Sequence, residues 1–100
     1  MAVAFLQEFS EGTQEQYDQA VETLARSGIK SEGRIFHVAG PMGAGMEAGW
    51  RIVDVWESQE AFDAFIQRVG PILQVLGMWP PDESKTWTVH NLLSGPENHL

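Results

Sequence analysis

The sequence contains no cysteine and few basic residues. Without cysteine the chain can form no disulfide, no thiolate metal site and no cysteine nucleophile. Lysine and arginine together number 6 against 14 acidic residues, so the formal net charge is -8. Because phosphate groups are repelled by such a surface, we expect neither nucleic acid nor an anionic membrane as a partner.

Long hydrophobic runs are also missing, since no stretch approaches the ~20 apolar residues that a membrane span needs. The first residues, Met1 to Phe5, have neither the basic region nor the small-residue cleavage site of a signal peptide. The sequence therefore predicts a cytoplasmic location. Its 100 residues, 43% of them hydrophobic, are typical of one domain with its own core.

Two segments have the residue spacing of amphipathic helices. The first begins at Thr13, where Gln16 can complete a capping box, and ends at Gly28. The second is capped by Ser58 and is expected to continue to about residue 76, with a kink at Pro71.

Four further segments are predicted to be β-strands: residues 2–9, 34–40, 50–56 and 86–93. The predicted element order is therefore β-α-β-β-α-β. With right-handed crossovers, this order gives a ferredoxin-like α+β sandwich, in which both helices cover one face of a four-stranded antiparallel sheet.

Residues 1–93 are expected to form this single domain, and residues 94–100 a loose, polar C-terminal tail. The glycine-rich segment 40–49 is interpreted as a mobile hairpin over a cavity mouth. No helix follows its glycines, so they do not form a phosphate-binding loop.

The predicted sheet is apolar on both faces. In the segment 50–56, Trp50, Ile52 and Trp56 lie on one face and Val53 and Val55 on the other. A monomer seldom leaves so large an apolar face in water, and the polar tail is too short to cover it. The pattern therefore predicts a homodimer in which two sheets pack face to face around small cavities.

The run DVWESQEAF at residues 54–62 resembles the strand-to-helix signature of the dimeric α+β barrel superfamily, and within it the antibiotic-biosynthesis-monooxygenase-like group. Residues 36–41 and 49–54 resemble a small actinobacterial-type branch of that group. The resemblance implies a homodimeric barrel. It also implies one of several activities: cofactor-free oxygenation, haem degradation, lactone isomerisation, polyketide cyclisation, or none. One departure is Phe65, which stands where many members carry a histidine.

Three residues are candidates for acid-base catalysis: Asp54, His37 and His90. Asp54 lies in an apolar strand, where a carboxylate is costly to bury unless it is paired, so we expect it to bond His37. Each residue also has a structural interpretation, as a strand-end salt bridge or as a histidine bonded to the main chain. His99 lies in the tail and is not a candidate.

Aromatic and basic side chains are candidates for ligand binding. The four tryptophans could line an aromatic pocket or fill the dimer interface. Arg51 and Arg34 could meet an anionic group or serve as solvated strand ends. The predicted substrate-binding residues are Trp50, Trp56, Trp79, Trp87 and Arg51.

These observations favour an enzyme that acts on an aromatic or polyketide-like molecule by acid-base chemistry or cofactor-free oxygenation. Two alternatives remain open: a non-catalytic dimer that binds a hydrophobic ligand or haem, and a dimer without a ligand. We expect no metal site and no cofactor, with haem as the exception if His37 is an axial ligand.

Overall fold

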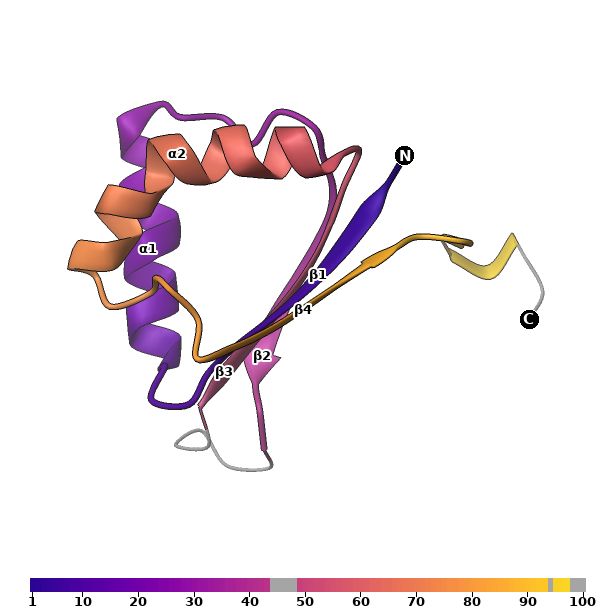
Figure 1. Ribbon diagram of the computed structural model, residues 1–100. Coiled ribbons are helices and arrows are strands. Elements are labelled where there is room, and N and C mark those ends of the chain that lie inside the picture. Colours follow the sequence, from indigo (N-terminus) through magenta and orange to yellow (C-terminus); the bar gives the residue numbers. More distant parts are fainter. Residues whose placement is uncertain (44–48, 94, 98–100) are drawn as a thin grey trace.

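The computed structural model describes residues 1–43, 49–93 and 95–97 (Figure 1). The predicted order of elements and the ferredoxin-like fold are confirmed. In chain order the elements are β1 (Val3–Phe9), α1 (Gln14–Ser27), β2 (Arg34–Pro41), β3 (Trp50–Trp56), α2 (Gln59–Val75), β4 (Glu83–Thr88) and the 3-10 helix η1 (Gly95–Glu97).

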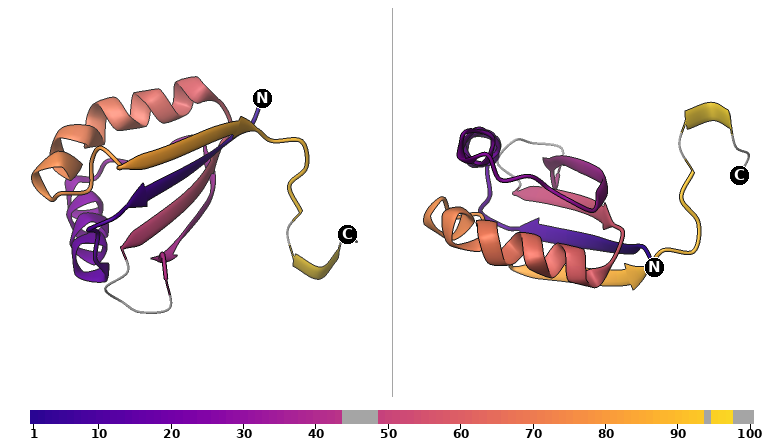
Figure 2. Two further views of the ribbon diagram at one scale, coloured as in Figure 1. Left: turned by 60° about the horizontal axis from the view of Figure 1, so that its bottom comes forward. Right: turned by 90° about the horizontal axis from the view of Figure 1, so that it is seen from above.

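The four strands form one sheet in the order β2-β3-β1-β4, and each pair of neighbours is antiparallel. Both helices lie on the same face of this sheet (Figures 1 and 2). No helix in the described part of the chain is long and apolar enough to cross a membrane.

The helix ends follow the predicted signals. Thr13 caps α1: its hydroxyl accepts a hydrogen bond from the Gln16 amide, and the Gln16 side chain accepts one from the Thr13 amide, each at 3.1 Å. Gly28 ends the helix with φ at 77°, a conformation that favours glycine. Ser58 caps α2, which contains Pro71 and changes direction along its length in Figure 1.

The fourth strand was predicted three residues too late at its start and five too late at its end, because it comprises Glu83–Thr88 rather than 86–93. Its pairing with β1 explains the difference. Glu83 is opposite Glu8 and Thr88 is opposite Val3, where β1 begins, so later residues have no strand to pair with. The carboxylate of Asp82 fixes the start by accepting hydrogen bonds from the amide and hydroxyl of Ser10.

The core lies between the sheet and the helices in two clusters. One contains Trp56, which is completely buried, and packs Phe62 and Phe65 of α2 against the sheet. The other contains Trp50 and Phe9. The clusters sit toward opposite ends of the sheet, and the space between them is the cavity described below.

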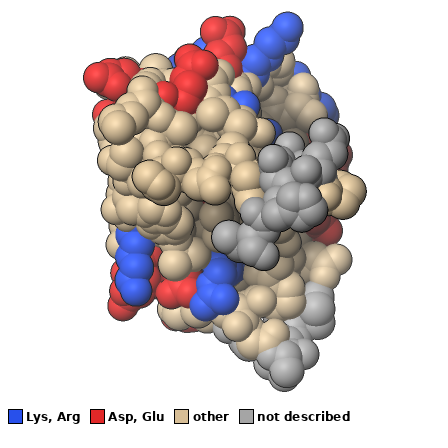
Figure 3. All heavy atoms as spheres, turned by 90° about the vertical axis from the view of Figure 1, so that its right-hand side faces the viewer, with Lys and Arg blue, Asp and Glu red and all other residues tan. Residues whose placement is uncertain are grey.

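The opposite face of the sheet carries no helix. Phe36, Val38 and Trp87 are each nearly half exposed there. Figure 3 shows this face with uncharged residues over its middle and charged residues toward its upper and lower edges. The chain after β4 leads away from the sheet (Figures 1 and 2), so its described part does not cover the face.

Part of two predictions falls outside the described residues. The predicted flap at 40–49 includes residues 44–48, and the predicted tail includes residues 94 and 98–100. At the base of the hairpin, the Met42 amide donates a hydrogen bond to the Gly49 carbonyl.

Candidate functional site

A cavity of about 430 Å³ lies between the sheet and the two helices. Most of its wall is apolar, with Phe62 and Phe65 of α2 on one side and Leu24 and Ile29 of the α1 region on another. Its polar lining residues are Gln7, Tyr17, Ser31, Arg34, His37 and Asp54. An apolar space with a few polar groups is the usual composition of a small-molecule site.

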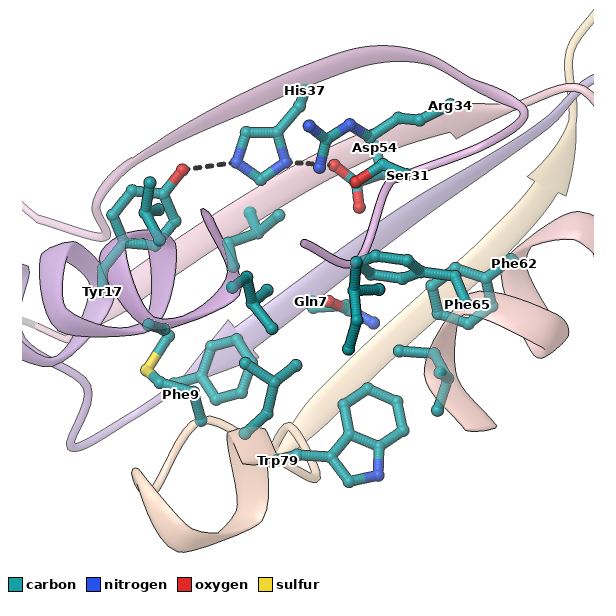
Figure 4. Close-up of a pocket in the computed structure, with 18 of the residues that line it drawn as sticks. Gln7, Phe9, Tyr17, Ser31, Arg34, His37, Asp54, Phe62, Phe65 and Trp79 are labelled. Atoms are coloured by element: carbon teal, nitrogen blue, oxygen red, sulfur yellow. Dashed lines mark hydrogen bonds and ion pairs between the residues drawn. The ribbon is translucent and has the colours of Figure 1, made fainter. Parts of the chain in front are cut away.

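Three of these polar side chains form a continuous hydrogen-bonded chain (Figure 4). The Tyr17 hydroxyl lies 2.5 Å from Nε2 of His37, and Nδ1 of His37 lies 2.5 Å from Oδ1 of Asp54. The predicted contact between Asp54 and His37 is therefore confirmed. Tyr17 of α1 extends the pair to the helix layer.

The acceptor character of the carboxylate determines the direction of these bonds. An ionised Asp54 can only accept, so Nδ1–H of His37 donates to it. Nε2 of a neutral imidazole is then an acceptor, and the Tyr17 hydroxyl donates to it. His37 therefore bridges Tyr17 and Asp54, and it connects the helix layer to the buried carboxylate.

The sheet register brings His37 and Asp54 together. His37 on β2 is directly opposite Asp54 on β3, so both side chains point to the helix side. A β-bulge between Arg34 and Phe36 also places Arg34, which is opposite Trp56, on that side. Without a bulge, residues three apart on a strand point to opposite faces.

Asp54 is 7% exposed, and both of its carboxylate oxygens have partners. His37 bonds Oδ1, and Nε1–H of the buried Trp56 donates to Oδ2 at 3.3 Å. These bonds offset the desolvation cost of a buried carboxylate and fix its orientation.

Burial raises the pKa of the Tyr17 phenol, and the charges of Asp54 and Asp18 raise it further. The Arg34 guanidinium acts in the opposite direction. Tyr17 is thus a neutral hydrogen-bond donor at physiological pH. Arg34 forms no ion pair with the described residues, and its positive charge remains available at the cavity wall.

Three other predicted site residues, His90, Trp87 and Arg51, lie outside this cavity. His90 is exposed and follows the end of β4, so it lies outside the cavity that His37 and Asp54 line. Trp87 lies on the opposite face of the sheet, since it is opposite Ala4. Arg51 lies on that face too, where it bonds Glu8 and borders a shallower pocket.

The other three tryptophans lie on the helix side, one in the cavity wall and two in the core. Trp79, in the chain after α2, lines the cavity as predicted. Trp50 and Trp56 are on the helix side but are buried in the two core clusters rather than in the cavity wall. Each is at a terminus of β3, so the two indole rings fill the core at opposite ends of the strand.

Three polar residues of the site were not recognised from the sequence: Tyr17, Gln7 and Ser31. Tyr17 has the spacing of an apolar residue of its helix, but its hydroxyl needs a partner when it is buried. Gln7 lies on β1 between Phe5 and Phe9 on the buried face, and it is only 8% exposed. A polar residue in an otherwise apolar alternation was the available signal.

A haem iron does not fit the histidine of this site. Nδ1 of His37 carries the proton that it donates to Asp54, and the lone pair of Nε2 accepts from Tyr17, so no lone pair is free to bind iron. Within residues 1–43, 49–93 and 95–97, no group of three potential metal ligands is found.

The ferredoxin-like fold is similar to that of several solved structures whose names describe them as candidate antibiotic biosynthesis monooxygenases. No protein-family model and no curated protein matches the sequence. The structure is similar to SnoaB, a cofactor-independent oxygenase from Streptomyces nogalater, with a TM-score of 0.66 and 15% identity over 94% of this chain and 98% of that one.

Two further solved structures are similar. A candidate antibiotic biosynthesis monooxygenase from Chloroflexus aurantiacus has a TM-score of 0.65 and 17% identity, covering 94% of this chain and 98% of its own. A haem-degrading protein from Mycobacterium tuberculosis has a TM-score of 0.57 and 17% identity, covering 94% of this chain and 100% of its own. At these identities the likeness establishes the fold.

Proposed function

We propose that this protein is an acid-base enzyme that removes the proton from a phenolic or enolic hydroxyl of an aromatic ligand bound in the cavity. The observation that carries the proposal is the hydrogen-bonded chain Tyr17–His37–Asp54 in the wall of a mainly apolar cavity. In this proposal a planar ligand lies between the aromatic and aliphatic walls of the cavity. Its hydroxyl lies next to the hydrogen-bonded side chains Tyr17, His37 and Asp54.

The proton moves in two coupled transfers. The ligand hydroxyl donates to the Tyr17 oxygen while Tyr17 gives its own proton to Nε2 of His37. The products are a ligand anion, a neutral Tyr17 and an imidazolium held by Asp54. Tyr17 then donates a hydrogen bond to the ligand oxygen, and the charge of Arg34 stabilises the anion further.

A naphthol tests this mechanism, because its anion absorbs at longer wavelength than the neutral form. We expect binding to lower the pKa of naphthol by about 1–3 units, as nearby opposite charges do. The variant His37→Gln should still bind naphthol but should lose most of this lowering. The measurement is the absorbance of the saturated complex as a function of pH.

His90→Gln is the matched control, since it makes the same change at an exposed histidine outside the cavity. It should ionise bound naphthol like the wild type. Equal ionisation by the wild type and by His37→Gln would contradict the proton relay. That result would favour the alternative of a carrier that binds an aromatic ligand without chemistry.

The ligand anion also provides a route to cofactor-free oxygenation, the activity in the name of SnoaB. An ionised aromatic is electron-rich and can reduce dioxygen directly. In the balanced reaction the C–OH group and a ring C–H react with O₂ to give the two C=O groups of a quinone and H₂O. Oxygen uptake that accompanies ionisation would distinguish this outcome from simple proton transfer.

We also propose that the sheet face without helices is the contact between two copies of the chain. Phe36, Val38 and Trp87 are exposed on it, and Leu6 and Val53 are half-buried beside them. The same apolar face on a second copy would cover it across a two-fold axis. The two cavities would then lie on the outer sides of the paired sheets.

Light scattering should give a mass of about twice 11.1 kDa for the wild type. Val38→Glu should shift the protein toward monomer, because a carboxylate would be buried at the centre of an apolar contact. Val75→Glu is the matched control: Val75 is 86% exposed on α2, away from this face, and this variant should remain a dimer. A monomeric wild type at micromolar concentration would contradict the contact.

A further inference from the structure

Gln7 is a polar residue of the cavity that the proton relay does not use. Its neighbours on the same face of β1, Phe5 and Phe9, are each 5% exposed, and Gln7 itself is 8% exposed. The residue is thus held in the apolar centre of the molecule, where a polar group is costly without a partner.

The side-chain amide of Gln7 makes no hydrogen bond to any described residue of the chain. Its atoms are not sealed inside the core either: within the described residues, the sealed side-chain atom without a partner is Nε1 of Trp50. Gln7 instead lines the cavity, and Figure 4 shows its amide among the apolar lining, apart from the bonded chain Tyr17–His37–Asp54. A buried amide aimed into a cavity is positioned to bind a ligand.

The sheet register separates Gln7 from the relay. Gln7 is opposite Ile52 on β3, whereas His37 is opposite Asp54, two residues further along that strand. β3 lies between β1 and β2, so the two backbones are roughly 10 Å apart across the sheet and offset by roughly 7 Å along it. One hydroxyl group cannot reach both ends.

We propose that Gln7 is a specificity-determining residue that selects ligands with a second oxygen function. The ligand class is then a fused-ring aromatic with a hydroxyl at the relay end and a carbonyl or hydroxyl at the opposite end. An amide suits either group, because it offers two donors and an acceptor. This inference rests on the proposed function and defines the substrate class of the same cavity.

The test compares two probes by calorimetric titration: a naphthol with one hydroxyl, and a naphthalenediol with a second hydroxyl on the far ring. The wild type should bind the diol roughly threefold to tenfold more tightly, which is the ratio that one neutral hydrogen bond gives. Gln7→Met keeps the length of the side chain and removes the amide, so the ratio should fall to about one.

Gln67→Met is the matched control, because it removes an exposed amide on α2 outside the cavity, and it should keep the wild-type ratio. Gln7→Asn keeps the amide but shortens its reach and should give an intermediate ratio. The ligand-free Gln7→Met protein should melt at the same temperature as the wild type or higher, because it loses an unpartnered amide.

A wild-type ratio near one, or an unchanged ratio in Gln7→Met, would overturn the inference. A Gln7→Met protein that fails to fold would overturn it too, since the amide would then hold the sheet together. The same titrations in the His37→Gln background separate the two proposals. There the preference for the diol should persist even if bound naphthol is never ionised.

Discussion

Asp54→Asn should abolish most of the ability of the protein to ionise a bound naphthol. The change keeps the shape of the side chain but removes the charge that stabilises the imidazolium of His37, 2.5 Å away. We expect the pKa of bound naphthol to return by about 1–3 units toward its value in water. The affinity for the naphtholate anion would then fall by about tenfold for each unit.

The unfolding free energy of Asp54→Asn distinguishes a functional carboxylate from a structural one. If Asp54 serves the relay, the variant should fold with little loss, because removing a buried charge also removes its desolvation cost. If Asp54 serves the fold, stability should fall by about 1–3 kcal/mol while naphthol ionisation stays unchanged. Asp63→Asn, the same change at an exposed position on α2, should alter neither measurement.

Trp56→Ala should cause the largest loss of stability, about 3–5 kcal/mol. Trp56 is completely buried, and its ring packs against Phe65 at 5.0 Å and against Phe62 at 5.8 Å between centroids. Alanine would leave a large cavity between β3 and α2. Chemical denaturation monitored by circular dichroism measures the change.

Trp56→Phe is the companion variant, because it keeps an aromatic ring in the core and removes the indole N–H that bonds Asp54. It should lose much less stability than Trp56→Ala. Val75→Ala, at an exposed position on α2, should change stability by less than about 0.5 kcal/mol. A loss below about 1 kcal/mol in Trp56→Ala would mean that the core of the sheet is not organised around this ring.

The sequence predicts this fold well where local signals and pairing agree. Thr13, Gln16 and Gly28 define α1 through cap chemistry that depends on neighbouring residues only. The alternation in β3 is equally local, and its predicted bounds match those observed. The bounds of β4 were missed because they depend on where β1 begins, which is a long-range property.

The candidate site was predicted in part. Asp54 could be recognised because an acid among apolar residues of a strand needs a partner. Its partner His37 was the leading candidate, but Tyr17 comes from a helix whose position over the sheet no local pattern encodes. The sequence left open whether His90 shares the cavity and whether Trp87 lines a pocket or a dimer interface, because alternation alone does not fix the register of β4.

The β-bulge in β2 makes the site sensitive to chain length at one point. Arg34 and His37 share the cavity side only because one extra residue is accommodated between Arg34 and Phe36. If the same residues paired regularly, without the bulge, either the cation or the imidazole would be turned to the sheet face without helices. Deleting the extra residue would instead leave the two side chains two residues apart and keep both on the cavity side. Among related chains, the number of residues between these two positions therefore shows whether a bulge is needed to keep both groups in the cavity.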